Sequence, residues 1–185
     1  MDASAHSAPA PATHQKAGLV DNDDVADWKA RVNDVLARPG EHINSSSPES
    51  AQPWSSTFFG CCSPIDTCLM TWCLPCVTFG KTHHRVRKDG DLKGYEAVNT
   101  TCILFCGSAL FGLHWIPMSM QRANIREKYN LQGNCLVDIA TACCCGLCDL
   151  VQQDKEAAYR ELNHGAAVNQ QYQSNGGMSY PADHK

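Results

Sequence analysis

The distribution of cysteine constrains this chain more than any other feature. The chain has twelve cysteines in 185 residues, and all of them fall between Cys61 and Cys148. Most of them form two clusters that lie far apart in the sequence. The first cluster contains Cys61, Cys62, Cys68, Cys73 and Cys76, and the second contains Cys143, Cys144, Cys145 and Cys148. A fold that brings the two clusters together would gather many thiols in a small volume.

The N-terminal sequence indicates the redox state of these thiols, and the net charge indicates which class of partner to expect. Residues 1–18 contain no apolar stretch of the kind that a secretory signal peptide needs. We therefore expect a reducing compartment, where clustered thiols more often bind metal, react or carry lipid than form disulfides. The net charge of −4 does not indicate a nucleic-acid-binding protein.

Composition divides the chain into a cysteine-rich domain with polar ends. Residues 1–53 are expected to be mostly disordered, apart from a short helix near residues 24–37 with Trp28 on its apolar face. Residues 54–162 are expected to form a small, mainly α domain with irregular metal-binding-type loops and one or two short apolar helices. Residues 163–185 have the composition of a disordered tail.

Residues 101–118 form the most apolar stretch, which carries no formal charge and is expected to end at Pro117. Its length is at the lower limit for a transmembrane helix, so a buried or interfacial helix and a membrane span both remain open. Cys102 and Cys106 are four residues apart and would share one helix face, either as metal ligands or as small buried side chains.

The spacing of the clustered cysteines predicts a metal site. Two thiolates in a Cys-x2-Cys pair can bind one tetrahedral ion, and thiolates select soft ions such as zinc or cadmium. We predict one zinc site formed by Cys73, Cys76, Cys145 and Cys148. The alternative ligands are Cys61, Cys62, Cys68, Cys143 and Cys144, and His83 or His84 is a further alternative.

Three ordered motifs lie between Trp54 and Leu162. The first comprises Cys61-Cys62, Cys68-Leu69, Pro75-Cys76 and Val77-Thr78-Phe79-Gly80; the second Arg122, Ile125, Arg126 and Tyr129; the third Asp138, Cys145, Cys148, Leu150, Gln152, Lys155 and Glu156. In these motifs the chain resembles the placenta-specific-eight family of cysteine-rich proteins, which includes cornifelin, plant cadmium-resistance proteins and plant fruit-weight or cell-number regulators. It differs from the family pattern at Leu74, where a cysteine is expected, and at Cys73, one place early. The run from Gly80 to Arg85 looks most like fungal members.

The resemblance implies a protein associated with a membrane, often the plasma membrane, and linked to metal resistance or to organ size. Together with the thiols it predicts a non-enzymatic protein that binds zinc or cadmium at the plasma membrane, with its cysteine clusters in the cytosol and with self-association as one mode of assembly. One alternative is a cytoplasmic scaffold with a structural zinc, which would bind partners through the Trp28 helix or the basic stretch around Arg122. Others are a thiol hydrolase that uses His83, His84 or His114, and lipid attachment at the paired cysteines.

Overall fold

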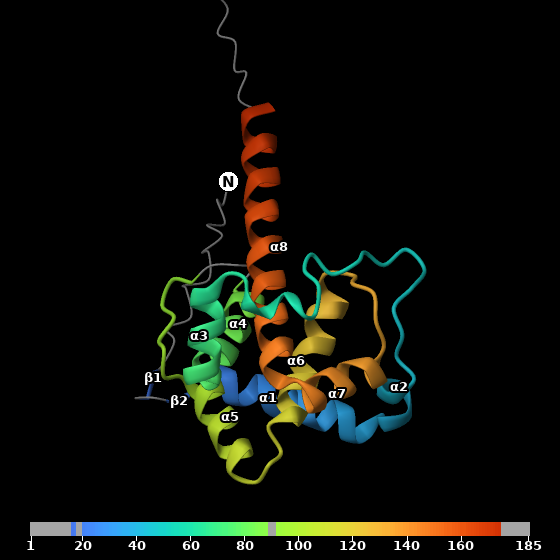
Figure 1. The fold of residues 1–185 in the computed structure, drawn as a ribbon, viewed down its shortest axis with the longest axis vertical. Helices are drawn as coiled ribbons and strands as arrows, with labels where there is room; N and C mark the ends of the chain where they lie inside the picture. The colour runs from blue at the N-terminus through green and yellow to red at the C-terminus, as the bar shows by residue number, and fades with distance from the viewer. Residues whose placement is uncertain (1–15, 18–19, 89–91, 175–185) are drawn as a thin grey trace, which may run out of the picture.

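The computed structural model describes residues 16–17, 20–88 and 92–174, and this part of the chain is mainly helical, as predicted. Its elements pack into one body from which the last helix projects (Figure 1). In chain order they are β1 (Lys16–Ala17), β2 (Val20–Asp21), α1 (Asn22–Ala37), α2 (Pro39–Ile43), the short 3-10 helix η1 (Gly60–Cys62), α3 (Ile65–Cys73), α4 (Pro75–Arg87), α5 (Thr100–Leu110), α6 (Trp115–Lys128), α7 (Cys135–Cys144) and α8 (Gly146–Ser174).

Helix α1 begins where Asp21 accepts a hydrogen bond from the Asp23 amide at 2.9 Å, which satisfies a free donor of the first turn. It docks through its buried residue, Trp28. The Trp28 indole donates to Thr101 Oγ1 on α5 at 3.1 Å, and its ring packs beside Phe79 on α4. Trp28 therefore docks α1 against α4 and α5, whereas Val32 and Leu36 of the same helix are exposed.

The stretch after α1 is packed against the body, although its composition is that of a linker. Pro39 starts α2, because proline is well tolerated in the first helical turn. Beyond α2, Ser46 pairs with Asn134 and Gln52 pairs with Leu131 in isolated β-bridges. Ala51, which lies between Ser46 and Gln52 in the sequence, is buried. Residues 44–52 therefore pack along the loop between α6 and α7.

The core forms where α4, α5, α6 and α8 meet. Phe79 is fully buried and lies in one cluster with Phe105, Met118 and Leu150, one residue from each of these helices. Burial of side chains of this size stabilises a fold by about 1.5–3 kcal/mol each. This cluster fixes α4 and α5, which carry three of the cysteines, against the helix that follows the second cysteine cluster.

The apolar stretch 101–118 is two helices rather than one. Gly112 adopts a φ of 68°, a conformation that glycine tolerates best, and it lies in the turn between α5 and α6. Pro117 sits in the first turn of α6, so the expectation that it ends a helix is wrong. Within the described ranges, none of the helices has both the length and the apolar character to cross a membrane.

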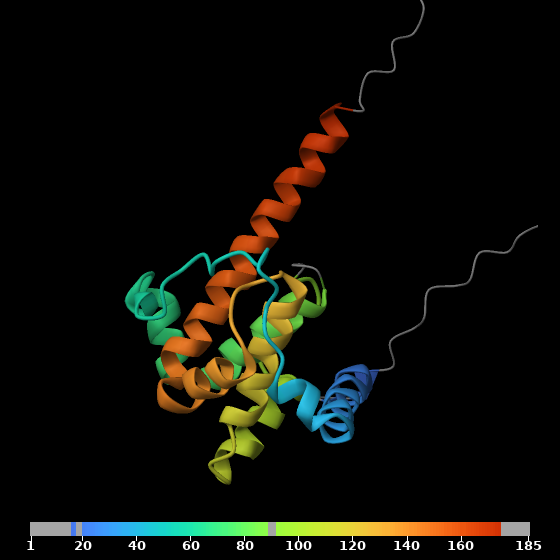
Figure 2. The ribbon, with the colours of Figure 1, turned by 90° about the vertical axis from the view of Figure 1, so that its right-hand side faces the viewer.

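Helix α8 is the longest element and runs past the domain boundary expected at residue 162. It continues to Ser174, and its distal part extends away from the body (Figure 2). Its first half is buried against the other helices, with Leu150, Val151 and Ala157 at 0–1% exposure. The remaining residues of the expected tail, 175–185, lie outside the described part of the chain.

Candidate metal-binding thiols

Three thiols converge where α4 begins beside α5. The Sγ atoms of Cys76, Cys102 and Cys106 all lie within 4.8 Å of one another. Cys76 is in the first turn of α4, and the other two are one helical turn apart on α5. Cys102 is buried and Cys106 is exposed, so this three-thiol group is closed on its inner side and open on its outer side. Three sulfur donors in this arrangement suit a soft metal ion.

A close approach of α4 and α5 makes this convergence possible. A Cβ atom on Gly80 would lie 2.8 Å from Oδ1 of Asn99, which is the N-cap residue of α5. A methyl group at this point would force the Asn99 side chain or one of the two helices to shift. The Tyr95 hydroxyl also donates to the Val77 carbonyl at 3.0 Å, which ties the preceding loop to α4. The motif glycine therefore sets the distance between Cys76 and the thiols of α5.

The surroundings of the three-thiol group favour protonated sulfur in the absence of a metal. Burial raises the pKa of Cys76, Cys102 and Cys106 above the usual value for a thiol, and the neighbouring thiols contribute to the shifts. Reactive cysteines generally have a lowered pKa, because the thiolate is the nucleophile. A bound cation would reverse the preference, because metal ions deprotonate the thiols that coordinate them. The group therefore suits metal coordination better than nucleophilic catalysis.

The predicted ligands are distributed differently from the single site expected from sequence. Cys76 lies with Cys102 and Cys106, whereas Cys145 and Cys148 lie with Cys61. The thiols of Cys61 and Cys68 raise the pKa of Cys62. Three further predicted ligands are exposed at helix ends: Cys73 at the end of α3, and Cys143 and Cys144 at the end of α7. All cysteines of the chain are free thiols in this structure.

The histidines considered as ligands have other neighbours. His83 is buried and its ring stacks on Trp28 at a centroid distance of 5.0 Å. Burial lowers its pKa to about 3, so the ring is neutral at ordinary pH. His84 packs beside Tyr95, and His114 packs beside Phe105. Among the described residues, the side chains placed to hold a metal ion are the cysteines Cys76, Cys102 and Cys106.

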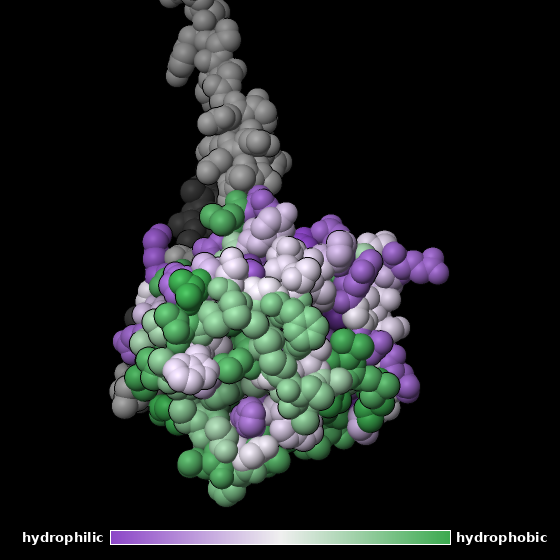
Figure 3. Space-filling model, viewed as in Figure 1, coloured by the Kyte–Doolittle hydropathy of each residue, from purple (hydrophilic) through white to green (hydrophobic). Residues whose placement is uncertain are grey.

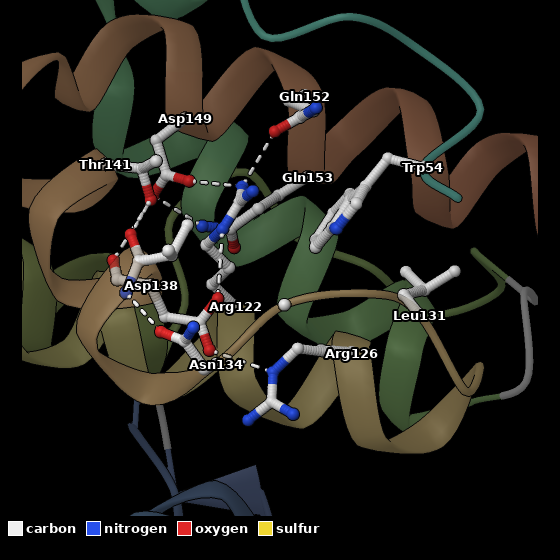
Figure 4. A network of polar contacts seen from close by, with 12 residues as sticks. Trp54, Arg122, Arg126, Leu131, Asn134, Asp138, Thr141, Asp149, Gln152 and Gln153 are labelled. Atoms are coloured by element: carbon white, nitrogen blue, oxygen red, sulfur yellow. Dashed lines mark hydrogen bonds and ion pairs between the residues drawn. The ribbon is translucent and has the colours of Figure 1, made fainter. Parts of the chain in front are cut away.

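The basic stretch around Arg122 is a buried ion-pair network rather than a binding surface. Arg122 contacts Asp138 of α7 at 3.2 Å and Asp149 of α8 at 2.7 Å, and the Trp54 ring lies 4.0 Å from its guanidinium (Figure 4). Arg126 contacts the second oxygen of Asp138 at 3.0 Å. These contacts connect α6, α7 and α8 through side chains of the second and third motifs. The network therefore positions the start of α8, where Cys145 and Cys148 lie.

One side of the molecule is apolar and carries many of the exposed cysteines. Figure 3 shows apolar residues over the side on which α3, α5 and α7 lie. Segments 65–75, 100–117 and 135–147 contain two formally charged residues, Asp66 and the buried Asp138. We call this surface the apolar face. The exposed large side chains of these segments are Ile65, Leu69, Met70, Trp72, Leu74, Ile103, Leu104, Leu110, Phe111, Leu113, Ile116, Leu136, Val137 and Leu147.

Comparison with known proteins agrees with the motifs. The model of the PLAC8 family matches residues 54–156. The chain belongs to the PLAC8 family. It is 30% identical over 140 residues to Protein PLANT CADMIUM RESISTANCE 2 of Arabidopsis thaliana, an alignment that covers 74% of this chain and 88% of the relative. It is 33% identical over 144 residues to Cell number regulator 7 of Zea mays, covering 75% of this chain and 78% of the relative. No solved structure matches the chain.

The family assignment confirms the resemblance inferred from the three motifs. The names of these PLAC8 relatives refer to cadmium resistance and to cell number, and neither denotes an enzyme. The predicted zinc site and its alternative ligands did not include Cys102 and Cys106, whose role as ligands the sequence left open and which the structure brings to Cys76. Their i, i+4 spacing was the available signal, because residues so placed share one helix face.

Proposed function

We propose that this PLAC8 protein is a non-enzymatic protein that binds soft divalent metal, zinc or cadmium, and acts in metal homeostasis or resistance. The observation that carries the proposal is the convergence of Cys76, Cys102 and Cys106 within 4.8 Å. The names of the cadmium-resistance relatives agree with this role. Thiolates prefer zinc, cadmium and copper(I) over magnesium or calcium.

The three-thiol group would bind an ion that can be exchanged. Three protein ligands leave one position of a tetrahedral ion open, as in zinc sites where a further ligand enters. The exposed Cys106 lies on the open side, while the buried Cys102 is the inner ligand. Cadmium could therefore enter and leave without unfolding of the domain. Such exchange suits a protein that takes up or hands over metal.

We place this activity at a membrane surface, with the plasma membrane as the expected site and the thiols on the cytosolic side. The apolar face supports this location, because an exposed apolar surface of this extent marks a protein or membrane contact. Association would occur through the face in the plane of the membrane. The stripe of Ile103, Cys106 and Leu110 on α5 is exposed, so the three-thiol group would lie beside the lipid.

A cadmium titration with two matched cysteine variants tests the proposal. Thiolate coordination of cadmium gives ultraviolet charge-transfer absorption, which can be followed as the ion is added to purified protein. Cys106→Ser should weaken cadmium binding by at least about tenfold, because one of three thiolate ligands is lost. Cys73→Ser is the control, because Cys73 is exposed and lies outside the three-thiol group. If Cys73→Ser alone lost cadmium binding, the site would instead be the Cys-x2-Cys pair of Cys73 and Cys76.

The cell-number relatives support a second candidate, a growth-regulating interaction protein whose metal is structural. The two functions differ in what Cys106→Ser should do in cells. A metal-resistance protein would lose the ability to restore growth of a cadmium-sensitive host, while its abundance stays unchanged. An interaction protein would retain its growth effect in the same variant and would not alter cadmium tolerance.

A further inference from the structure

A second group of thiols joins the first and third motifs. The Sγ atoms of Cys145 and Cys148 are 2.8 Å apart, and Cys148 Sγ is 3.1 Å from Cys61 Sγ. Cys61 and Cys148 are 87 positions apart in the chain, so the tertiary fold makes their contact. None of the three belongs to the group formed by Cys76, Cys102 and Cys106. The three motif thiols therefore meet at a separate place.

Two further thiols extend this contact on the other side. Cys62 follows Cys61 directly in η1, and the thiols of Cys61 and Cys68 raise its pKa. Sulfur contacts join Cys145, Cys148 and Cys61 in that order, and Cys62 and Cys68 follow at the Cys61 end of this row. We call them the five-thiol chain. A disulfide would use two of these sulfurs and leave the others unpaired, whereas a tetrahedral ion uses four.

The protein scaffold holds the segment of Cys61 and Cys62 against α8 by contacts of its own. Lys155 of α8 donates to the carbonyls of Gly60 at 3.2 Å and Ser63 at 2.7 Å, one on each side of the Cys61-Cys62 pair. Gln152 donates to the Ser56 carbonyl at 2.8 Å. The segment that carries Cys61 is therefore fixed to α8, where the Cys61 thiol contacts Cys148.

The start of α8 also suits a negatively charged metal cluster. A Cβ atom on Gly146 would lie 3.2 Å from Met118 Cε, so this glycine lets the helix begin close against α6. Cys145 precedes the first turn of α8, and Cys148 is within it. Four thiolates on a divalent ion carry a net negative charge, which the positive end of a helix and the ammonium of Lys155 both favour.

We propose that the five-thiol chain holds one zinc ion in a closed four-thiolate site, formed by Cys61, Cys145, Cys148 and a fourth sulfur from Cys62 or Cys68. This site is structural, because four protein ligands leave no open position on zinc. It fastens η1 and α3 to the start of α8. The protein would then have two thiolate sites with different roles, a closed one that stabilises the fold and the open three-thiol group that exchanges metal.

Mapping of thiol alkylation in the wild-type protein tests the site without any substitution. Purified full-length protein loaded with zinc is treated with an alkylating reagent, with and without a strong chelator, and the modified residues are identified by mass spectrometry. Cys61, Cys145 and Cys148 should be protected in the zinc form and become reactive after chelation. Cys143 and Cys144, which are exposed in the same segment, are the internal control and should react equally in both samples.

Two outcomes of this mapping would overturn the proposal. One is reaction of Cys61 and Cys145 as fast as Cys143 and Cys144 in the zinc form. The other is a disulfide between Cys145 and Cys148 in protein purified from a reducing cytosol. A protection that persists unchanged after chelation and zinc depletion would assign it to burial alone, and this result also counts against the metal site.

Metal stoichiometry separates this inference from the proposed function. After exchangeable ions are removed, the wild-type protein should keep about one zinc per chain. Cys148→Ser should lose it, whereas Cys144→Ser and Cys106→Ser should retain it. The cadmium titration of Cys106→Ser can fail while this zinc remains, and the zinc can be absent while that titration succeeds. If Cys148→Ser does not fold, the wild-type mapping still decides the question.

Discussion

At the scale of single residues, the buried ion pairs of α6 carry the strongest expectation for stability. Arg122 is 4% exposed and contacts two acidic side chains that are themselves buried, Asp138 and Asp149. Removing one partner of a buried ion pair leaves an uncompensated charge and costs about 3–5 kcal/mol. Arg122→Leu should therefore lower the free energy of unfolding by this amount, measured by urea denaturation.

A surface arginine gives the matched control for this measurement. Arg38 pairs with Asp34 and Glu41, but more than half of its side chain is exposed. Exposed ion pairs contribute about 0–1 kcal/mol, so Arg38→Leu should change little. Equal losses in the two variants would show that the network around Arg122 does not act as a buried unit.

The burial of His83 predicts that the stability of the protein depends on pH. Its ring is 3% exposed, its Nε2 atom has no hydrogen-bond partner, and Asp27 is 3.7 Å away. Burial and the charge of Arg31 lower the pKa of His83 from 6.5 to about 3. Between these values the unfolded chain binds a proton that the folded protein does not, so the stabilising contribution is complete above pH 6.5 and is lost as pH falls.

The substitution His83→Phe should remove this pH dependence while keeping a ring to stack on Trp28. Between pH 6.5 and pH 5 the wild-type protein should lose about 2 kcal/mol of unfolding free energy through this residue, at about 1.4 kcal/mol per pH unit. The variant should lose correspondingly less over the same interval. If the curves of unfolding free energy against pH were parallel for the two proteins, His83 would not be a buried neutral group in the folded state.

At the scale of elements, one buried side chain makes the apolar attachment of α1, beside an ion pair of its Asp24 with Arg87 of α4. Trp28 is the buried residue of this helix, while Leu36 is 73% exposed. Truncation of a large buried aromatic costs about 3–5 kcal/mol. Trp28→Ala should release α1, which would appear as faster amide hydrogen exchange in residues 22–37 with α8 unchanged. Leu36→Ala should leave exchange in both helices as it is.

The packing of α4 against α5 connects helix geometry to metal binding. A side chain on Gly80 would overlap Asn99, whereas Gly107 on the outer side of α5 has no atom within 4 Å of an added Cβ. Gly80→Ala should push the helices apart, lower stability by about 1–3 kcal/mol and weaken cadmium binding by the three-thiol group. Gly107→Ala should leave cadmium binding intact. If the two variants bind cadmium equally well, the helix spacing does not control the site.

At the scale of the whole molecule, the apolar face predicts how the protein meets a membrane. Leu110 at the end of α5 and Phe111 directly after it are 85% and 79% exposed. Replacing both with Asp should reduce the fraction of protein that floats with liposomes, because charged groups are costly in an apolar environment. Leu36→Asp on α1, outside the segments of the apolar face, is the control and should float as the wild type does. Flotation that all the variants share would mean that another surface makes the contact.

The sequence by itself determined the family, the helical class and the residue types of the sites. The three motifs were sufficient for the PLAC8 assignment, since a family model covers the same part of the chain. Cysteine clustering indicated thiol chemistry, and the spacing around Trp28 predicted a helix. These features depend on order and local periodicity, which are present in the chain before it folds.

Only the tertiary structure decided which thiols meet. Cys76 joins Cys102 because α4 packs against α5 at Gly80, and Cys148 joins Cys61 because Lys155 and its neighbours fix the 55–63 segment to α8. Contacts across 26 and 87 positions of sequence depend on helix packing and buried ion pairs, which spacing along one element cannot encode. For the same reason the basic residues of the second motif, which suggested a surface, form the interior that holds α6, α7 and α8 together.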